Sequence, residues 1–199
     1  MSILDKISKV ECFDKEISYI NNLEYIEDFK VLIDLLPDYF FSVAASSTGK
    51  YHPEFSLGDG GLLRHTKAAV RIAYELMNDS CIGGKYTSRE KDLMIIALTL
   101  HDGVKHGIPE EKYTRADHPL LVSKLIKENQ NKLKMKEEDV EFICHVIDSH
   151  MGPWNTHPYT KEEILPIPKD IFQNFVHMCD YLASRKFLDV KFEDNNIVE

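Results

Sequence analysis

The stretch Leu93-Met-Ile-Ile-Ala-Leu-Thr-Leu-His101-Asp102-Gly-Val-Lys105 directs the interpretation of the whole chain, because an apolar run ends there in an adjacent histidine and aspartate. The run before His101 has the composition of a buried helix. An imidazole and a carboxylate at the end of such a helix need compensation for their lost hydration. A divalent cation compensates both, since neutral imidazole and carboxylate are among its ordinary ligands. The alternative is a helix that simply ends in two polar residues, and the rest of the chain decides between them.

The size and charge of the chain restrict its class. With 199 residues, 43% hydrophobic and 29% charged, it has the composition of a soluble globular protein with one main domain. The formal net charge is −9, and no basic block occurs. This argues against binding to duplex DNA or long RNA, which requires clustered Lys and Arg. The net charge still allows the protein to bind a small anion or the end of a nucleic-acid strand through a bound cation, which would supply local positive charge.

The cysteines and the apolar runs indicate the compartment. Cys12, Cys81, Cys144 and Cys179 have no zinc-knuckle spacing, and the last two fall inside predicted helices, where cysteine is usually a small buried hydrophobe. Nothing requires a disulfide. The N-terminus lacks a signal-peptide pattern, and no apolar run approaches the ~20 residues that cross a bilayer. We therefore expect a cytoplasmic protein without a membrane partner.

Helical periodicity dominates the sequence, and strand signals are nearly absent. We predict an all-α protein, a single helical bundle of residues 40–199 with an N-terminal helical extension of residues 1–39 packed on it. Ser88 is the expected N-cap of the helix that ends at His101. The predicted helices are 23–36 with a further short turn at 38–45, 61–77, 88–101, 117–127, 136–151 and 170–187.

Six potential metal ligands lie on different predicted helices or helix ends. Because they show no local finger spacing, a metal site here must be assembled by the tertiary fold inside a bundle. A mixed histidine and carboxylate set of this size suits two borderline cations (Mn²⁺, Fe²⁺, Co²⁺, Ni²⁺ or Zn²⁺) rather than Ca²⁺. The six residues are His65, His101, Asp102, His118, His150 and Asp180.

Asp102 is the natural bridging carboxylate of such a pair of ions. His65, His101 and Asp180 would complete the first site, and the two remaining histidines would hold the second ion. Two cations that share Asp102 would lower the pKa of a water for attack on phosphorus.

The order of these residues resembles the HD-domain phosphohydrolase superfamily over about residues 40–190. The resemblance rests on Gly60-Gly-Leu-Leu-Arg-His65-Thr, on His101-Asp102-Gly-Val-Lys105 and on the later histidines and aspartate. Within the superfamily, the chain is most similar to the HD domain of bacterial 3′–5′ exoribonucleases. Their Ser-His-His-Gly motif here reads Ser149-His150-Met151-Gly152, so Met151 replaces the second histidine. Their accompanying OB domain is absent. The resemblance implies metal ligation by the same six residues.

The predicted function is a metal-dependent phosphodiesterase that acts on a nucleotide or a short oligonucleotide. Asp102 and Lys105 are the predicted catalytic residues, because Lys105 follows Asp102 by three positions and reaches either the carboxylate or the phosphate. Residues 46–61 form a Gly-, Ser- and Pro-rich loop, in which Lys50 and His52 are candidate substrate-binding groups, although a plain solvated loop is an equal alternative. A 5′-nucleotidase or phosphomonoesterase, or a non-catalytic nucleotide-binding module, are the alternative functions. The oligomeric state is left open.

Four further histidine, arginine and lysine residues lie near the six candidate ligands in the sequence. His145 is interpreted as structural, since it points elsewhere on its helix. His177 lies three residues before Asp180 and is a candidate to support a ligand. Arg64 and Lys67 flank the first histidine and are further candidates to contact the phosphate, although charged side chains beside a helix start are usually solvated.

Overall fold

A computed structural model describes residues 3–46, 49–188 and 190–198, and in this part of the chain eight α-helices form the fold. The prediction of an all-α protein is confirmed. Short 3₁₀ helices occur at Ile3–Asp5, Glu11–Phe13, Asp38–Phe41, Glu54–Ser56 and Gln130–Lys132. The other elements are α1 (Asp14–Ile17), α2 (Leu23–Asp34), α3 (Gly61–Asn78), α4 (Ser80–Gly83), α5 (Ser88–Leu100), α6 (His118–Glu128), α7 (Glu137–Asp148), α8 (Ile171–Ala183), β1 (Phe192–Glu193) and β2 (Asn196–Ile197).

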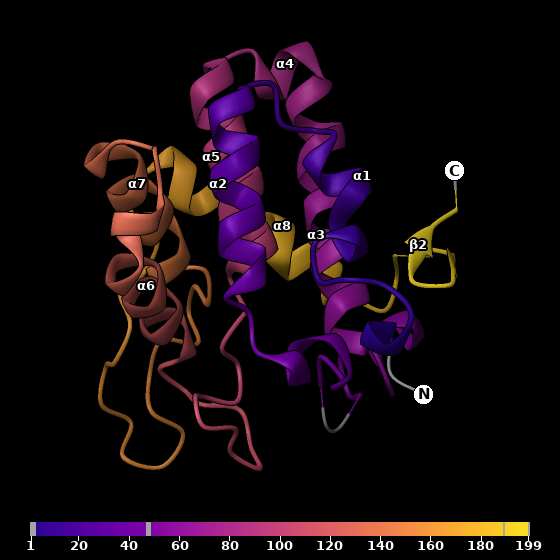
Figure 1. The fold of residues 1–199 in the computed structure, drawn as a ribbon. Coiled ribbons are helices and arrows are strands. Elements are labelled where there is room, and N and C mark those ends of the chain that lie inside the picture. The colour runs from indigo at the N-terminus through magenta and orange to yellow at the C-terminus, as the bar shows by residue number, and fades with distance from the viewer. Residues whose placement is uncertain (1–2, 47–48, 189, 199) are drawn as a thin grey trace.

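Helix α5 lies at the centre of the bundle. It contacts α2, α3, α7 and α8, and Figure 1 shows α2 running along it, with α6 and α7 on one side and α3 on the other. Every residue from Asp92 to Leu100 is buried. A helix that is apolar on all sides is stable only when other helices surround it. The end of α5, with the His101-Asp102 pair, is therefore carried into the interior.

The N-terminal residues belong to the same hydrophobic core. Phe13, Phe29 and Phe40 are fully buried among residues of α3 and α5. The rings of Phe13 and Phe40 lie 6.2 Å apart, which ties the first segment to the 3₁₀ helix before the long loop. The predicted boundary between an N-terminal extension (residues 1–39) and the main domain (residues 40–199) stays a prediction. The hydrophobic core runs continuously across it.

The N-terminus of α5 differs from the prediction. Thr87, and not Ser88, is the N-cap, because Thr87 is the residue with extended backbone angles. Its hydroxyl accepts from the amide of Glu90 at 3.2 Å, and the Glu90 carboxylate accepts from the amide of Thr87 at 2.7 Å. This reciprocal capping box satisfies two amides that the helix leaves unpaired.

Several predicted helical segments end earlier in the structure, and the helix expected at 23–36 ends at Asp34. The helix expected at 136–151 ends at Asp148, because the chain turns at Ser149 and reaches the left-handed region at Gly152 (φ +58°). The helix expected at 170–187 ends at Ala183, and the turn expected at 38–45 is helical only over Asp38–Phe41.

A small antiparallel hairpin follows the last helix and was not predicted. Phe192 pairs with Ile197, and Asp194 and Asn195 make the turn with positive φ angles. Asp and Asn tolerate positive φ better than most residues, so Asp194-Asn195 is a local signal for a turn. The two strands are only two residues long, and strands that short leave no alternation pattern in the sequence.

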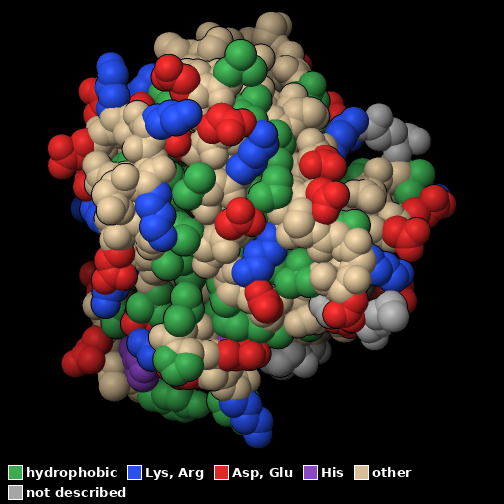
Figure 2. All heavy atoms as spheres, in the orientation of Figure 1, with side chains coloured by type: hydrophobic (Ala, Val, Ile, Leu, Met, Phe, Trp, Pro, Cys, Tyr) green, Lys and Arg blue, Asp and Glu red, His purple; other side chains and the backbone are tan. Residues whose placement is uncertain are grey.

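The surface and the cysteines agree with a globular chain. On the face shown in Figure 2, the described Lys and Arg side chains are interspersed with Asp and Glu. Cys144 and Cys179 are buried, as predicted, and all four cysteines are free. Within the described ranges, no helix combines the length and the apolar character needed to span a bilayer.

Candidate metal centre

Helix α3 presents the first histidine of the cluster. The chain enters α3 through Gly60, whose left-handed backbone (φ +69°) turns the loop into the helix. A side chain on Gly61 would overlap the carbonyl of Ser56, so the loop packs directly against the first turn. This places His65 on the inner face of α3, 1% exposed, with its Nε2 atom 2.9 Å from an Asp180 carboxylate oxygen.

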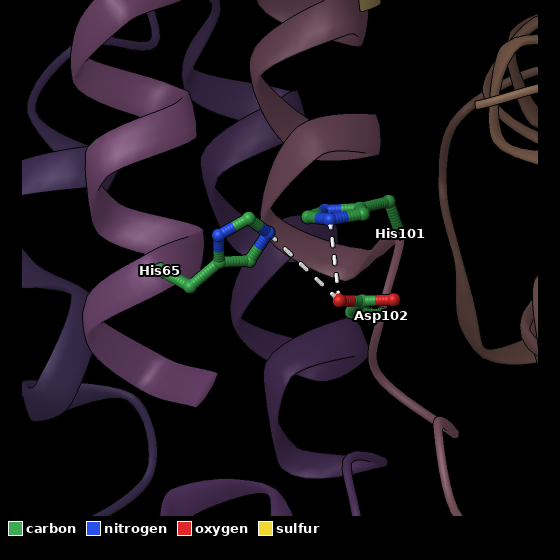
Figure 3. Close-up of side chains that lie close together, drawn as sticks. All are labelled: His65, His101 and Asp102. Atoms are coloured by element: carbon green, nitrogen blue, oxygen red, sulfur yellow. Dashed lines mark ion pairs between the residues drawn. The ribbon is translucent and has the colours of Figure 1, made fainter. Parts of the chain in front are cut away.

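The end of α5 presents the second histidine and the central carboxylate. Figure 3 shows His65 and His101 both directed at Asp102 from two neighbouring helices. Oδ2 of Asp102 lies 3.6 Å from Nε2 of His101 and 3.9 Å from Nε2 of His65. Nε2 of His101 is also 3.4 Å from Oδ1 of Asp180.

The other oxygen of Asp102 faces the second pair of histidines. Oδ1 of Asp102 lies 2.8 Å from Nε2 of His118 and 3.7 Å from Nε2 of His150. The six residues predicted from the sequence therefore come together, and Asp102 lies between the two histidine pairs. Three groups of possible ligands result: His65, His101 and Asp102; His101, His150 and Asp180; and Asp102, His118 and His150.

Backbone carbonyls orient three of the imidazoles. Nδ1 of His101, His118 and His150 lies within 2.6–2.8 Å of the carbonyl oxygen three residues earlier in the chain. A carbonyl only accepts, so each Nδ1 carries the proton and donates. Each Nε2 atom then directs a lone pair into the cluster, which is the arrangement of a metal-binding histidine.

Two observations show that the residues fit a cation. Nε2 of His118 lies 3.3 Å from Nε2 of His150, so two lone pairs face each other. Nε2 of His101 is buried and has no hydrogen-bond partner among the described residues. Unpaired buried acceptors are costly. Divalent cations between these nitrogens and the carboxylates would satisfy all of them.

The electrostatics also favour positive charge at this point. Burial would raise the pKa of the Asp102 carboxyl, but the ammonium of Lys105 and the imidazole of His101 outweigh it and hold this pKa well below its usual range. The neighbouring imidazoles of His101 and His65 do the same for the pKa of Asp180, again against the effect of burial. Burial lowers the pKa of His150 to about 4, so this imidazole stays neutral and available as a ligand.

A cavity of about 360 Å³ opens onto the cluster, a size suited to a small ligand. Lys105 lines it, with Nζ 2.6 Å from Oδ2 of Asp102, and His52 lines it as well. Lys50 is exposed and does not line this cavity, and its ammonium lies 5.0 Å from the ring centre of Tyr51. A larger hollow of about 960 Å³ beside the C-terminal hairpin contains none of the six cluster residues.

Two supporting residues lie just outside the cluster. Nδ1 of His177 donates to the carbonyl of His150 at 2.6 Å, as expected for a residue that supports a ligand. Tyr39 was not singled out from the sequence. Its hydroxyl donates to the carbonyl of Gly107 at 3.0 Å and accepts from the amide of His106 at 3.1 Å, which anchors the loop that carries Lys105. Only a long-range contact reveals this role.

The mouth of the cavity contains four planar side chains that sequence reasoning missed. They come from the long loop, from the segment after α7 and from the end of α8. No local motif marks them, since exposed aromatic residues are common. The four residues are Tyr51, Trp154, Tyr181 and Arg185.

The expectation that Arg64 and Lys67 are solvated was wrong. Lys67 is 2% exposed, and its ammonium pairs with Glu16 at 3.1 Å. The guanidinium of Arg64 donates to the carbonyls of Phe55 and Leu57 and thereby holds the loop against α3. Both cations stabilise the fold around the centre.

His145 lies away from the cluster. Its Nε2 is 2.6 Å from the carboxylate of Asp170, the N-cap residue of α8. The contact links α7 to the start of α8, in agreement with a structural role.

The structure is an all-helical bundle around a centre of four histidines and two aspartates, a set of donors that suits divalent cations. Residues 62–184 match the family model of the HD domain, which is more than half of the chain. The chain belongs to the HD domain family, whose members bind divalent metals and are generally metal-dependent phosphohydrolases. No significant match was found among the curated proteins or the solved structures. The particular similarity to exoribonuclease HD domains stays a prediction.

Proposed function

We propose that this protein is a metal-dependent phosphodiesterase that hydrolyses a nucleotide or a short oligonucleotide. The observation that carries the proposal is the position of Asp102 between two histidine pairs on the floor of a small cavity. A carboxylate that offers one oxygen to each pair suits two neighbouring cations. Paired cations are the usual arrangement for displacement at phosphorus.

The proposed ligands divide between the two sites. His65, His101 and Asp180 would hold one cation together with Oδ2 of Asp102. His118 and His150 would hold the other together with Oδ1. When bound, the cations lower the pKa of a water and offset the charge on the phosphate oxygens.

Lys105 is the residue through which the chain itself would contact the reacting phosphate. Its ammonium lines the cavity and lies beside Asp102. There it orients that carboxylate and presents positive charge to a phosphate oxygen. His52 lines the same cavity, and burial, together with the nearby ammonium of Lys105, lowers its pKa to about 4, so that it contacts substrate as a neutral group.

The size of the cavity and the net charge favour small substrates. A volume of about 360 Å³ lies near the small end of the range for ligand pockets, and a chain with net charge −9 attracts a long strand poorly. We expect a higher kcat/KM on a dinucleotide than on a 20-nucleotide strand. A preference for the long strand with a steep salt dependence would indicate an exonuclease instead.

The central experiment measures metal content and turnover together. His101→Ala is expected to lose metal and to abolish hydrolysis of bis(p-nitrophenyl) phosphate and of dinucleotides. His150→Ala is expected to lose about one equivalent of metal and to keep its fold. His145→Ala is the matched control, because this histidine lies outside the cluster, and it should retain both metal and turnover.

Two outcomes would overturn the proposal. One is an Asp102→Ala variant with full metal content and normal turnover. The other is a metal-loaded wild-type protein that cleaves phosphomonoesters but no phosphodiester, which would identify a phosphomonoesterase. Metal binding without turnover of either ester would indicate a non-catalytic module.

A further inference from the structure

The mouth of the cavity is formed by three aromatic rings and one guanidinium that lie close together. The rings of Trp154 and Tyr181 are nearly parallel, with an interplanar angle of 13° and centroids 5.8 Å apart. The guanidinium of Arg185 lies 4.3 Å from the ring centre of Tyr181 and 5.5 Å from that of Tyr51. We call these four side chains the aromatic rim.

Arg185 is held in the rim without a charged partner. Its Nε and Nη2 donate to the hydroxyl of Ser184 at 3.0 and 2.7 Å, and no carboxylate pairs with it in the part of the chain that the structure describes. Its guanidinium therefore lies against two tyrosine rings, and no described carboxylate compensates its charge.

Trp154 is both exposed and close to the metal centre. It is 52% exposed, so its ring is accessible to a ligand. It follows His150 by four residues, and its amide donates to the carbonyl of Met151 at 3.2 Å. Its ring also lies near His177, the residue that supports His150. A single ligand could thus place one of its atoms at the cluster and a planar group against Trp154 within the same cavity.

We propose that the aromatic rim is a base-binding platform, on which the base of the substrate stacks against Trp154 while its phosphate reaches the cluster. The inference rests on the proposed function. Stacking on an exposed tryptophan accepts any flat heterocycle, and Arg185 adds positive charge for the nearby anionic oxygens. The remaining walls of the cavity are mostly polar: they are formed by four cluster residues, His52 and Lys105, together with Met151 and Ser184, so the rim is where a flat apolar base would bind.

The sole tryptophan of the chain allows a direct binding test. The protein, at a fixed saturating Mn²⁺ concentration, is titrated with adenosine monophosphate and with ribose 5-phosphate. Tryptophan fluorescence is excited at the long-wavelength edge of the tryptophan absorption band, where adenine does not absorb. We expect saturable quenching by the nucleotide and none by ribose 5-phosphate, which has the same sugar and phosphate but no base.

Kinetics provide a second measurement. Trp154→Ala is expected to raise KM for a dinucleotide about tenfold, the effect of losing one base stack, while metal content and kcat stay near wild type. Trp154→Phe should restore most of the affinity. Tyr159→Ala is the matched control: this aromatic residue is 89% exposed but does not line the cavity, and its loss should leave KM unchanged.

The possible results separate this inference from the proposed function. Equal quenching by ribose 5-phosphate, or no saturable quenching by the nucleotide, would overturn the platform even if phosphodiesters are hydrolysed. Quenching by the nucleotide alone, in a protein that hydrolyses no phosphate ester, would support the platform and overturn the enzymatic function.

Discussion

At the scale of single residues, the turn after α7 shows how closely the second histidine pair is fitted. Gly152 has a positive φ of +58°, and a side chain there would overlap the imidazole of His177. That imidazole donates to the carbonyl of His150. The Ser149-His150-Met151-Gly152 segment therefore needs glycine at its end for both backbone and packing reasons.

Gly152→Ala is expected to displace His177 and the backbone of His150. We predict that it lowers metal content by about one equivalent and lowers turnover about tenfold, as for the loss of a group that supports a ligand. Gly58→Ala is the control, because Gly58 has a similar φ of +66° with no atom near its missing Cβ. That variant should lose stability through backbone strain but keep its metal. Equal metal contents in the two variants would refute the packing argument.

His52 makes a prediction about pH. Burial, together with the nearby ammonium of Lys105, lowers its pKa to about 4, against an unfolded value of about 6.5. Its protonation therefore favours the unfolded state. As the pH falls from about 6.5 to about 4, the wild-type protein should lose stability relative to His52→Gln. Urea unfolding of both proteins in the presence of chelator measures this, and parallel curves would contradict it.

At the scale of elements, the 3₁₀ helix Asp38–Phe41 reaches across the bundle to the loop after α5. Tyr39 both donates to the carbonyl of Gly107 and accepts from the amide of His106. Burial raises its pKa to about 12, so the phenol stays neutral and keeps both hydrogen bonds at working pH. Tyr39, which lies in the predicted N-terminal extension, thus contributes to the position of Lys105.

Tyr39→Phe removes both hydrogen bonds and leaves the amide of His106 without this partner. We expect the free energy of unfolding to fall by about 1–3 kcal/mol. Turnover should fall severalfold while metal content stays constant, because Lys105 moves and the ligands do not. Thermal unfolding, metal analysis and kcat measure these effects. Tyr113→Phe, at a tyrosine that is 69% exposed, should change none of them.

At the scale of the whole molecule, one buried ion pair joins distant parts of the chain. Lys67 on α3 pairs with Glu16 on α1, and its ammonium also lies 3.4 Å from the side-chain oxygen of Asn196 on β2. Both charged side chains are almost fully buried. Removing one partner would leave an uncompensated charge in the interior.

We predict that Lys67→Met lowers the free energy of unfolding by about 3–5 kcal/mol, the usual cost of leaving a buried partner unpaired. The double variant Lys67→Met with Glu16→Leu should recover most of this loss, because neither charge remains. A double-mutant cycle by urea unfolding measures the coupling. Additive losses would mean that the two charges do not interact.

The sequence alone determined the fold class and the set of residues that meet at the centre. Helical periodicity is a local property, and an apolar run that ends in His101-Asp102 shows that polar groups enter the core. The chemistry of histidine and aspartate then identified the six cluster members, of which His65 and Asp180 lie 115 residues apart. Their role as ligands stays a prediction.

Only the tertiary structure decided the surroundings of this centre. It divided the two oxygens of Asp102 between the histidine pairs, placed His52 but not Lys50 in the cavity, and brought Trp154 and Arg185 to its mouth. It also buried Lys67, whose partners lie 51 and 129 residues away. The physical reason is common to all of these features. A side chain's environment depends on which distant elements pack against it, and local periodicity carries no information about that packing.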